Sequence, residues 1–366
     1  MKVKSRGSRP RVTFKEIAKE LGVAVSTVSN AYNRPNQLSP ALREKVLETA
    51  RKLGYSGPDP MARSLRRRRA GAIGVVYGDE LSYAFTDPVH ALMLQGVATA
   101  IRNEHLGLLL ISGWSEKPEE TCAVRDAAVD GFLIHTLNNS DPLLAAILER
   151  TLPSVYVDRP GTDGLPSVVV EDEGGAKEAA RHLLELGHRN LGVLALPLSL
   201  GVRDGIISPE EQAESEYWAV RQRLKGYRSA AQEFGIAWEK NVTVYQSVEN
   251  RPQDGQVAAG VLLSQTPRPT AILAMSDQLA LGVLEYATEH GIRVPEELSV
   301  VGFDDAPLAA RLRPGLTTVH QDHLEKGKLA GQTLLALIKG EEYPSSVTLP
   351  THLVVRATTA PPPEIV

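Results

Sequence analysis

Charged and polar side chains stand directly after several short apolar runs of this sequence. Asp158 and Arg159 follow SVYV, Ser276 and Asp277 follow AILAM, and Asp304 ends VVGFD. Carboxylates and an arginine fork form charge-assisted hydrogen bonds that orient ligands rich in hydroxyl groups. These residue types therefore suggest reversible binding of a small polar molecule.

The apolar runs alternate with helical text, which predicts an α/β fold with parallel sheets. AIGVVY, LGLLLIS, GFLIH, SVYV, SVVV, LGVLAL, TAILAM and ELSVVGF are the expected strands. About 300 residues of such text exceed one comfortable core, so two lobes are expected. Ligands of open α/β sheets bind beyond the carboxyl ends of strands, which predicts a shared cleft. Phe85 and Asp87, in the loop after the first run, are expected to close it. For each of these residues taken singly, a turn or cap role is an equally open interpretation.

A second group of polar residues lies near the amino terminus. FKEIAKEL has helical spacing, Gly22 permits a sharp turn, and VSTVSNAYN follows as a second helix with a small, polar outer face. Two helices joined in this way predict a helix-turn-helix, whose second helix enters the DNA major groove. The other interpretation is a plain helical hairpin with serines on its wet side.

The side chains of this second helix suit contacts with DNA. The Asn30 amide can pair bidentately with adenine, Ser26 accepts several bases, and the Val25 methyl groups can pack on a thymine methyl. Four further residues suit phosphate contacts, which position the helix without reading sequence: Thr13, Thr27, Ser29 and Asn33.

Charge is divided unevenly along the chain, whose formal net charge is -4. Residues 1–70 contain 17 Lys and Arg against 5 Asp and Glu, or +12, which leaves 23 against 39, or -16, for the remainder. The amino-terminal part is therefore suited to a polyanion and the body is not.

Composition excludes several classes of protein. The single cysteine, Cys122, cannot form an internal disulfide, and no cysteine and histidine cluster has zinc-site spacing. No stretch approaches ~18 uninterrupted apolar residues, and no apolar segment follows the basic start. We expect no metal, no cofactor and no membrane partner, and a cytoplasmic location.

A third helix is indicated by Ser39-Pro40, an N-cap followed by proline at the first helical position, and ends at Gly54. Beyond it, Gly57, Pro58 and Pro60 break regular structure, and MARSLRR allows only a short helix. Such a short helix is marginal alone, so it should fold only against a partner.

These segments resemble a known family. VTFKEIAKELGVAVSTVSNAYN, LSPALREKVLETARKLGY and PDPMARSL are similar to the headpiece and hinge of LacI/GalR bacterial transcription regulators. The resemblance implies a DNA-binding headpiece at 1–57 and a hinge at 58–70. In the family a hinge leucine wedges a base step of the minor groove, and here that residue is Leu65. Tyr55, Ala62 and Arg63 are the other DNA contacts that it implies.

The body is similar to the core of the same family, a two-lobed fold shared with periplasmic sugar-binding proteins. The resemblance implies an effector-binding and dimerisation core at 71–366 whose chain crosses between lobes three times. Lobe 1 is expected at about 71–166 and 306–336, and lobe 2 at about 167–305 and 337–366. Arg223 and Asp304 match an arginine and an aspartate that family members use on the effector.

The chain departs from the family pattern at four places. Asn30 stands where arginine is common, Ala24 stands where serine often precedes the recognition helix, and Ser276 replaces a frequent asparagine. A polar insert occupies about residues 200–216 and is expected to flank the cleft. These departures leave the operator sequence and the effector identity open.

The function that the sequence favours is a homodimeric repressor that binds a near-palindromic operator under control of a small-molecule effector, sugar-like rather than purine. A soluble sugar-binding receptor without DNA function is the alternative; it would need a secretory signal and no basic head. An enzyme is not expected, because no P-loop or GxSxG motif occurs and the adjacent Asp304 and Asp305 should point in different directions.

Overall fold

The structure is a computed structural model that describes residues 12–55, 57, 69–78, 80–112, 122–138, 141–162, 164–199 and 201–364. The chain divides into two compact units, Met1–Ala70 and Gly71–Val366, which are described separately below. None of the helices in the described ranges combines the length and apolar character that a bilayer crossing requires.

The first unit is helical. It contains α1 (Phe14–Leu21), α2 (Val25–Asn33), the 3-10 helix η1 (Pro35–Gln37) and α3 (Pro40–Lys52). Gly22 adopts φ 63°, which gives the chain its turn between α1 and α2. The expected cap of α3 is confirmed, because Ser39 Oγ accepts from the Leu42 backbone N–H over 3.3 Å.

A small apolar core holds these helices together. Its buried members are Ile17, Ala18, Val28, Ala31, Val46 and Ala50. An aromatic group packs against it, in which the ring centroids of Phe14 and Tyr32 are 5.6 Å apart. Since Val28, Ala31 and Tyr32 are committed to this core, the opposite side of α2 is left for contacts outside the unit.

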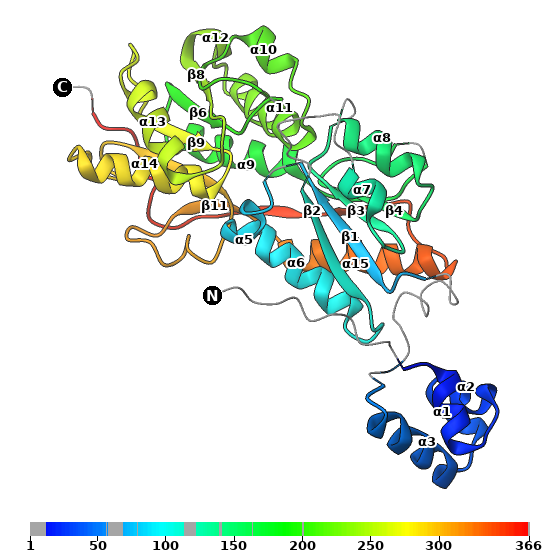
Figure 1. The fold of residues 1–366 in the computed structure, drawn as a ribbon. Coiled ribbons are helices and arrows are strands. Elements are labelled where there is room, and N and C mark those ends of the chain that lie inside the picture. The colour runs from blue at the N-terminus through cyan, green and yellow to red at the C-terminus, as the bar shows by residue number, and fades with distance from the viewer. Residues whose placement is uncertain are drawn as a thin grey trace, which may run out of the picture. The chain divides into compact units, whose positions relative to one another are not determined.

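The second unit contains two sheets (Figure 1). The first has the strand order β12-β5-β4-β3-β1-β2, and all of its pairs are parallel. Its strands are β1 (Ala72–Tyr77), β2 (Gly107–Ser112), β3 (Phe132–His135), β4 (Ser154–Val157), β5 (Ser167–Val170) and β12 (Ser346–Leu349). The short helix α5 (Tyr83–Thr86) follows β1, where a loop was expected.

Helices cover both faces of this first sheet. One face packs on α6 (Pro88–Ile101) and α15 (His323–Lys339), and the other on α7 (Cys122–Asp126) and α8 (Pro142–Glu149) (Figure 1). Helices α6 and α15 approach closely through Gly96 and Gly327; a Cβ on Gly327 would lie 2.0 Å from the Met93 carbonyl oxygen. This close contact sets the position of α15, the helix from which Lys326 reaches the space between the lobes.

The second sheet has the order β13-β11-β10-β9-β6-β8-β7. Its strands are β6 (Leu191–Ala195), β7 (Gly205–Ile206), β8 (Val242–Gln246), β9 (Ala271–Ala274), β10 (Ser299–Asp304), β11 (Thr317–Gln321) and β13 (Thr351–Val354). One face packs on α9 (Asp172–Glu185), α11 (Trp218–Glu233) and α12 (Trp238–Asn241), the other on α13 (Pro252–Leu263) and α14 (Asp277–Glu289). The short α10 (Pro209–Ala213) lies in the segment between β7 and α11.

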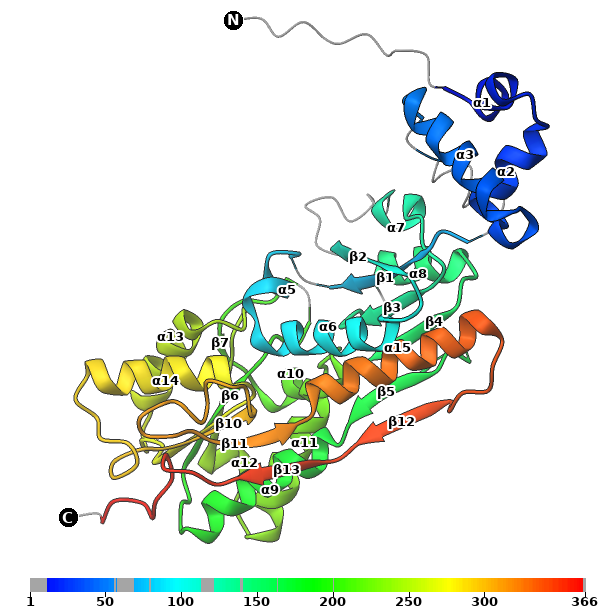
Figure 2. The same cartoon turned by 90° about the horizontal axis from the view of Figure 1, so that it is seen from below.

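The chain crosses between the two lobes three times, as the resemblance implied, but later than expected. Strand β5 belongs to the first sheet, β11 to the second and β12 to the first, so the crossings follow residues 170, 321 and 349. Figure 2 shows β11 leading into α15 and β12 leading into β13 along this boundary. The expected boundaries after 166, 305 and 336 therefore differ from the structure. An apolar strand such as SVVV does not reveal which sheet it joins, because pairing depends on its neighbours.

Candidate functional site

The outer side of α2 forms the candidate nucleic-acid surface of the first unit. Val25 is 43% exposed, Ser26 and Asn33 are exposed, and Thr27, Ser29 and Asn30 are half-buried. No acidic side chain lies on this helix. The surface is therefore small, polar and free of negative charge, which are properties that allow close approach to base edges.

Three expected DNA contacts of this unit already have partners within it. The Glu16 carboxylate accepts from the Thr13 backbone N–H over 2.6 Å and from the Thr13 hydroxyl over 3.1 Å. Asn33 Nδ2 donates to the Ser29 carbonyl oxygen over 3.1 Å, and the Tyr55 ring lies 5.5 Å from that of Phe14. Each of these three side chains thus has an interaction within the unit. Ala62, Arg63 and Leu65 lie outside the described residues.

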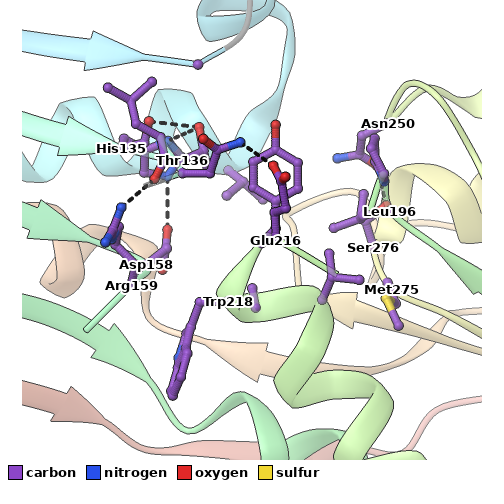
Figure 3. A pocket seen from close by; sticks show the side chains of 18 of the residues that line it. His135, Thr136, Asp158, Arg159, Leu196, Glu216, Trp218, Asn250, Met275 and Ser276 are labelled. Carbon is purple, nitrogen blue, oxygen red and sulfur yellow. Dashed lines mark hydrogen bonds and ion pairs between the residues drawn. The ribbon is translucent and has the colours of Figure 1, made fainter. Parts of the chain in front are cut away.

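A cavity of about 540 Å³ lies between the two lobes of the second unit. The first lobe contributes the ends of β1, β3 and β4 with Lys326 of α15, and the second contributes the ends of β6, β8, β9, β10 and β11 with the start of α11. Figure 3 shows His135, Asp158 and Arg159 on one side and Met275 and Ser276 on the other. The cavity thus occupies the place at strand ends that the sequence predicts.

Arg223 is held rigidly in the wall of this cavity. Its Nε donates to Asp172 Oδ1 over 2.8 Å, its Nη1 donates to the Met275 carbonyl oxygen, and its guanidinium lies 3.7 Å from the centre of the Phe303 ring. Both Arg223 and Asp172 are buried. This fork is therefore oriented before a ligand arrives.

Asp304 lies at the end of β10 with φ 122°, in the region that non-glycine residues rarely adopt. Gln321 Nε2 donates to its Oδ1 over 2.7 Å. Burial raises the pKa of Asp304 to about 7, with the charge of Asp87 adding to the effect and Arg223 opposing it. A hydroxyl donor from a ligand would favour the ionised form of this carboxyl.

Asp158, at the end of β4, is part of a buried charged network. Lys326 Nζ lies 2.7 and 2.8 Å from its two carboxylate oxygens, and His135 Nε2 lies 2.9 Å from Oδ2. Burial alone would raise the pKa of Asp158, but Lys326 and His135 outweigh it and hold the pKa well below its ordinary value. The lysine is only 2% exposed, so this ion pair lies away from solvent.

Comparisons with known proteins agree with this architecture. Residues 13–57 match the model of bacterial regulatory proteins of the lacI family, and residues 180–359 match that of a periplasmic binding protein-like domain. An HTH-type transcriptional regulator of Mycobacterium tuberculosis is 42% identical over 97% of this chain and 98% of its own length. The chain belongs to the LacI family. It is therefore a DNA-binding transcriptional regulator with a two-lobed, periplasmic-binding-protein-like core.

Two solved structures of this family are informative. The lac repressor dimer bound to operator and the anti-inducer ONPF has a TM-score of 0.76 and 26% identity, covering 96% of this chain and 100% of that one. The complex of the regulator CelR with cellobiose has a TM-score of 0.69 and 29% identity, covering 95% of this chain and 100% of that one.

Six of the eight predicted effector residues of this LacI-family chain line the cavity. They are Asp87, Asp158, Arg159, Arg223, Ser276 and Asp304. Two of them also cap helices, because Asp87 accepts from the Val89 N–H over 2.7 Å and Ser276 accepts from the Leu279 N–H over 3.1 Å. Asp87 and Ser276 therefore cap a helix and line the cavity at the same time.

The other two predicted residues do not line the cavity. Phe85 lies on α5 and is 68% exposed. The carboxylate of Asp277 accepts from the Thr318 hydroxyl over 2.6 Å and from the Ala306 N–H over 2.7 Å. Asp277 thus holds the segment after β10, including the backbone beside Asp304, instead of facing a ligand.

Several lining residues were missed by sequence reasoning. His135 ends the strand FLIH and could have been found by the same strand-end rule. Lys326 gives no such signal, because it lies within the regular helix α15 and reaches the cavity only through the pairing of α15 with α6. The insert was correctly expected beside the cleft, since Gly201, Val202 and Glu216 line the cavity.

Hydrogen bonds join the two lobes across the cavity. Asn138 Nδ2 of the first lobe donates to Glu216 Oε2 of the second over 2.6 Å. Asn250 Nδ2 of the second lobe donates to Asp87 Oδ2 of the first over 3.2 Å, and the Tyr83 hydroxyl donates to the Asn250 carbonyl oxygen over 3.4 Å. The relative position of the lobes is therefore tied to the polar side chains of the cavity.

Proposed function

We propose that this chain is a transcriptional repressor whose affinity for operator DNA is controlled by a sugar-like effector in the cleft. The observation that carries the proposal is the cavity itself, whose walls come from both lobes and which shares a chain with a helix-turn-helix. A ligand that binds both walls can change the arrangement of the lobes. A sugar-like ligand is favoured over a purine because strand-end carboxylates and Arg223 suit hydroxyl groups.

On the DNA side, Val25, Ser26 and Asn30 are proposed to meet base edges, and Thr27 and Ser29 to contact phosphates. Thr13, Asn33, Tyr55, Ala62 and Arg63 are proposed as further contacts, and Leu65 as the minor-groove wedge. The operator-bound lac repressor relative is a dimer, which supports two copies of this chain on a near-palindromic site. Such a regulator acts in the cytoplasm, the compartment that holds the DNA.

The proposed control links the cleft to the DNA through the lobe arrangement. Effector binding changes the distance between the two hinge segments of a dimer, and hence the affinity for operator. An effector that favours the DNA-bound arrangement acts as a corepressor, and one that opposes it acts as an inducer. The complex of the relative CelR with cellobiose supports a sugar as the effector of this chain.

Selection of operator sequences from random DNA tests the proposal. The full chain should enrich a near-palindromic site, and transcription from a promoter carrying that site should fall when the protein is added. A set of free sugars is then tested for altered operator affinity. Enrichment of no sequence, or transcription that rises with the protein alone, would count against a repressor.

A further inference from the structure

The cationic and anionic side chains that line the cavity are not matched in pairs, and this imbalance bears on the charge of the ligand. Five described lining residues are cationic: Arg159, Arg221, Arg223, Arg251 and Lys326. Three of them are neutralised by carboxylates, since Arg223 pairs with Asp172, Arg251 with Glu249, and Lys326 with Asp158. The positive charge of these three is therefore already committed within the protein.

The described contacts of Arg159 and Arg221 include backbone carbonyl oxygens and aromatic rings. Arg159 Nη1 donates to the Leu137 carbonyl oxygen over 2.9 Å, and its guanidinium stacks 4.4 Å from the centre of the Tyr156 ring. Arg221 Nη1 donates to the Ser215 carbonyl oxygen over 3.1 Å and lies against Trp218. Binding a phosphate would require these guanidinium groups to give up such contacts.

Carboxylates are in surplus on the same walls. Glu80, Asp87 and Glu216 line the cavity without an ion pair to a lysine or arginine within the described ranges. Asp304 also lines it without such a pair, and its pKa of about 7 leaves it only partly ionised at neutral pH. Their hydrogen bonds come from uncharged donors: Ser82 to Glu80, Asn138 to Glu216 and Gln321 to Asp304. An anionic ligand would add negative charge to walls that already carry an excess of it.

We propose that the cleft binds an uncharged polyhydroxylated ligand and discriminates against its phosphate esters. Ligand hydroxyl groups can donate to carboxylates that have no cationic partner, and they add no charge to the cavity. Asp87 and Asp304 offer such acceptors from opposite lobes. Trp218, Leu196 and Met275 supply apolar surface for the C–H faces of a sugar ring (Figure 3). This inference rests on the proposed function and narrows its ligand class.

Matched pairs of compounds test this proposal on the full-length, DNA-free protein. The protein is titrated calorimetrically with ribose, glucose, cellobiose and a set of hexitols. Each compound is compared with its phosphate monoester. We expect binding among the uncharged compounds, with each phosphate ester at least about tenfold weaker than its parent, or about 1.4 kcal/mol. Equal or tighter binding of a phosphate ester, or binding by no compound, overturns the proposal.

Variants separate a charge effect from a structural one. Glu80→Gln removes a negative charge at the cleft and should narrow the difference in affinity between a sugar and its phosphate ester. Glu289→Gln, an exposed carboxylate at the end of α14, is the matched control and should leave the difference unchanged. If Glu80→Gln also left the difference in affinity between a sugar and its phosphate ester unchanged, the discrimination would not arise from the charge of Glu80.

The same experiments distinguish this inference from the proposed function. Operator selection is performed separately from ligand titration. A chain that selects operator DNA and binds only phosphate esters retains the proposed function and loses the inference. A chain that binds uncharged sugars and selects no DNA sequence retains the ligand preference inferred here and loses the proposed function.

Discussion

Asn250 of the second lobe donates from Nδ2 to Asp87 Oδ2 of the first lobe over 3.2 Å, while its Oδ1 accepts from the Ser276 hydroxyl. One amide therefore connects the start of α6 with the start of α14 across the ligand cavity. Because the bond joins two bodies that a ligand must also join, its strength bears on how closed the lobes are without ligand.

Asn250→Ala should shift the ligand-free protein toward a more open lobe arrangement. Loss of hydrogen bonds worth about 1 kcal/mol each is enough to change the populations of two nearby states severalfold. Small-angle X-ray scattering of the isolated variant and wild type checks this, with a larger radius of gyration expected for the variant. Asn241→Ala is the control. It removes a side-chain hydrogen bond to Asn190 inside one lobe and should leave the scattering unchanged. Identical curves for Asn250→Ala and wild type would show that this contact does not hold the lobes.

Removing only one member of the buried ion pair Lys326–Asp158 should lower the free energy of unfolding strongly. Lys326→Met leaves the Asp158 carboxylate in the protein interior without its cation, and such changes typically cost roughly 3–5 kcal/mol of unfolding free energy. Combining Lys326→Met with Asp158→Asn should recover much of that loss, because no unpaired charge remains. Urea unfolding measures both variants.

A matched control for this pair lies two residues further along the same helix. Lys328 pairs with Glu325 over 2.9 Å, but both side chains are partly exposed to solvent. Lys328→Met should therefore change the unfolding free energy by no more than about 1 kcal/mol. Similar losses for Lys326→Met and Lys328→Met would contradict the account of burial given above.

Asp304→Asn should change how stability depends on pH. The folded state raises the pKa of Asp304 from the ordinary 3.8 to about 7, so between these values the folded chain holds a proton that the unfolded chain has lost. The contribution of this group to stability therefore falls as pH rises through that window and is constant above it. Asparagine removes the effect, at about 1.4 kcal/mol for each unit of pKa difference.

Melting temperatures at several pH values check this prediction. Relative to wild type, Asp304→Asn should gain stability between about pH 4 and pH 7 and keep that gain at higher pH. A constant difference between the two proteins across this range would mean that Asp304 ionises with an ordinary pKa.

Local patterns were sufficient to predict the helices of the headpiece, the α/β core and the cleft at its strand ends. The N-cap of Ser39 and the inward side of α2 depend on spacing within a few residues, which a sequence displays directly. Lobe membership of β5, β11 and β12 depends on pairing between distant segments, and three boundaries were misplaced for that reason. Lys326 and Asn250 were missed because helix packing and lobe closure, rather than local pattern, bring them to the cavity.

Asn30→Arg should change which base the recognition helix prefers. An asparagine amide pairs bidentately with adenine, whereas an arginine fork pairs with guanine, so the selected operator should gain guanine at one symmetric position. Selection from random DNA with both proteins measures the change, and affinity for the original operator should fall by about 1–3 kcal/mol. Asn36→Arg adds the same side chain on η1, outside α2, and should strengthen binding to all sequences without altering the preferred one. Identical selected sequences for Asn30→Arg and wild type would mean that residue 30 does not read a base, and that α2 contacts the groove through other side chains.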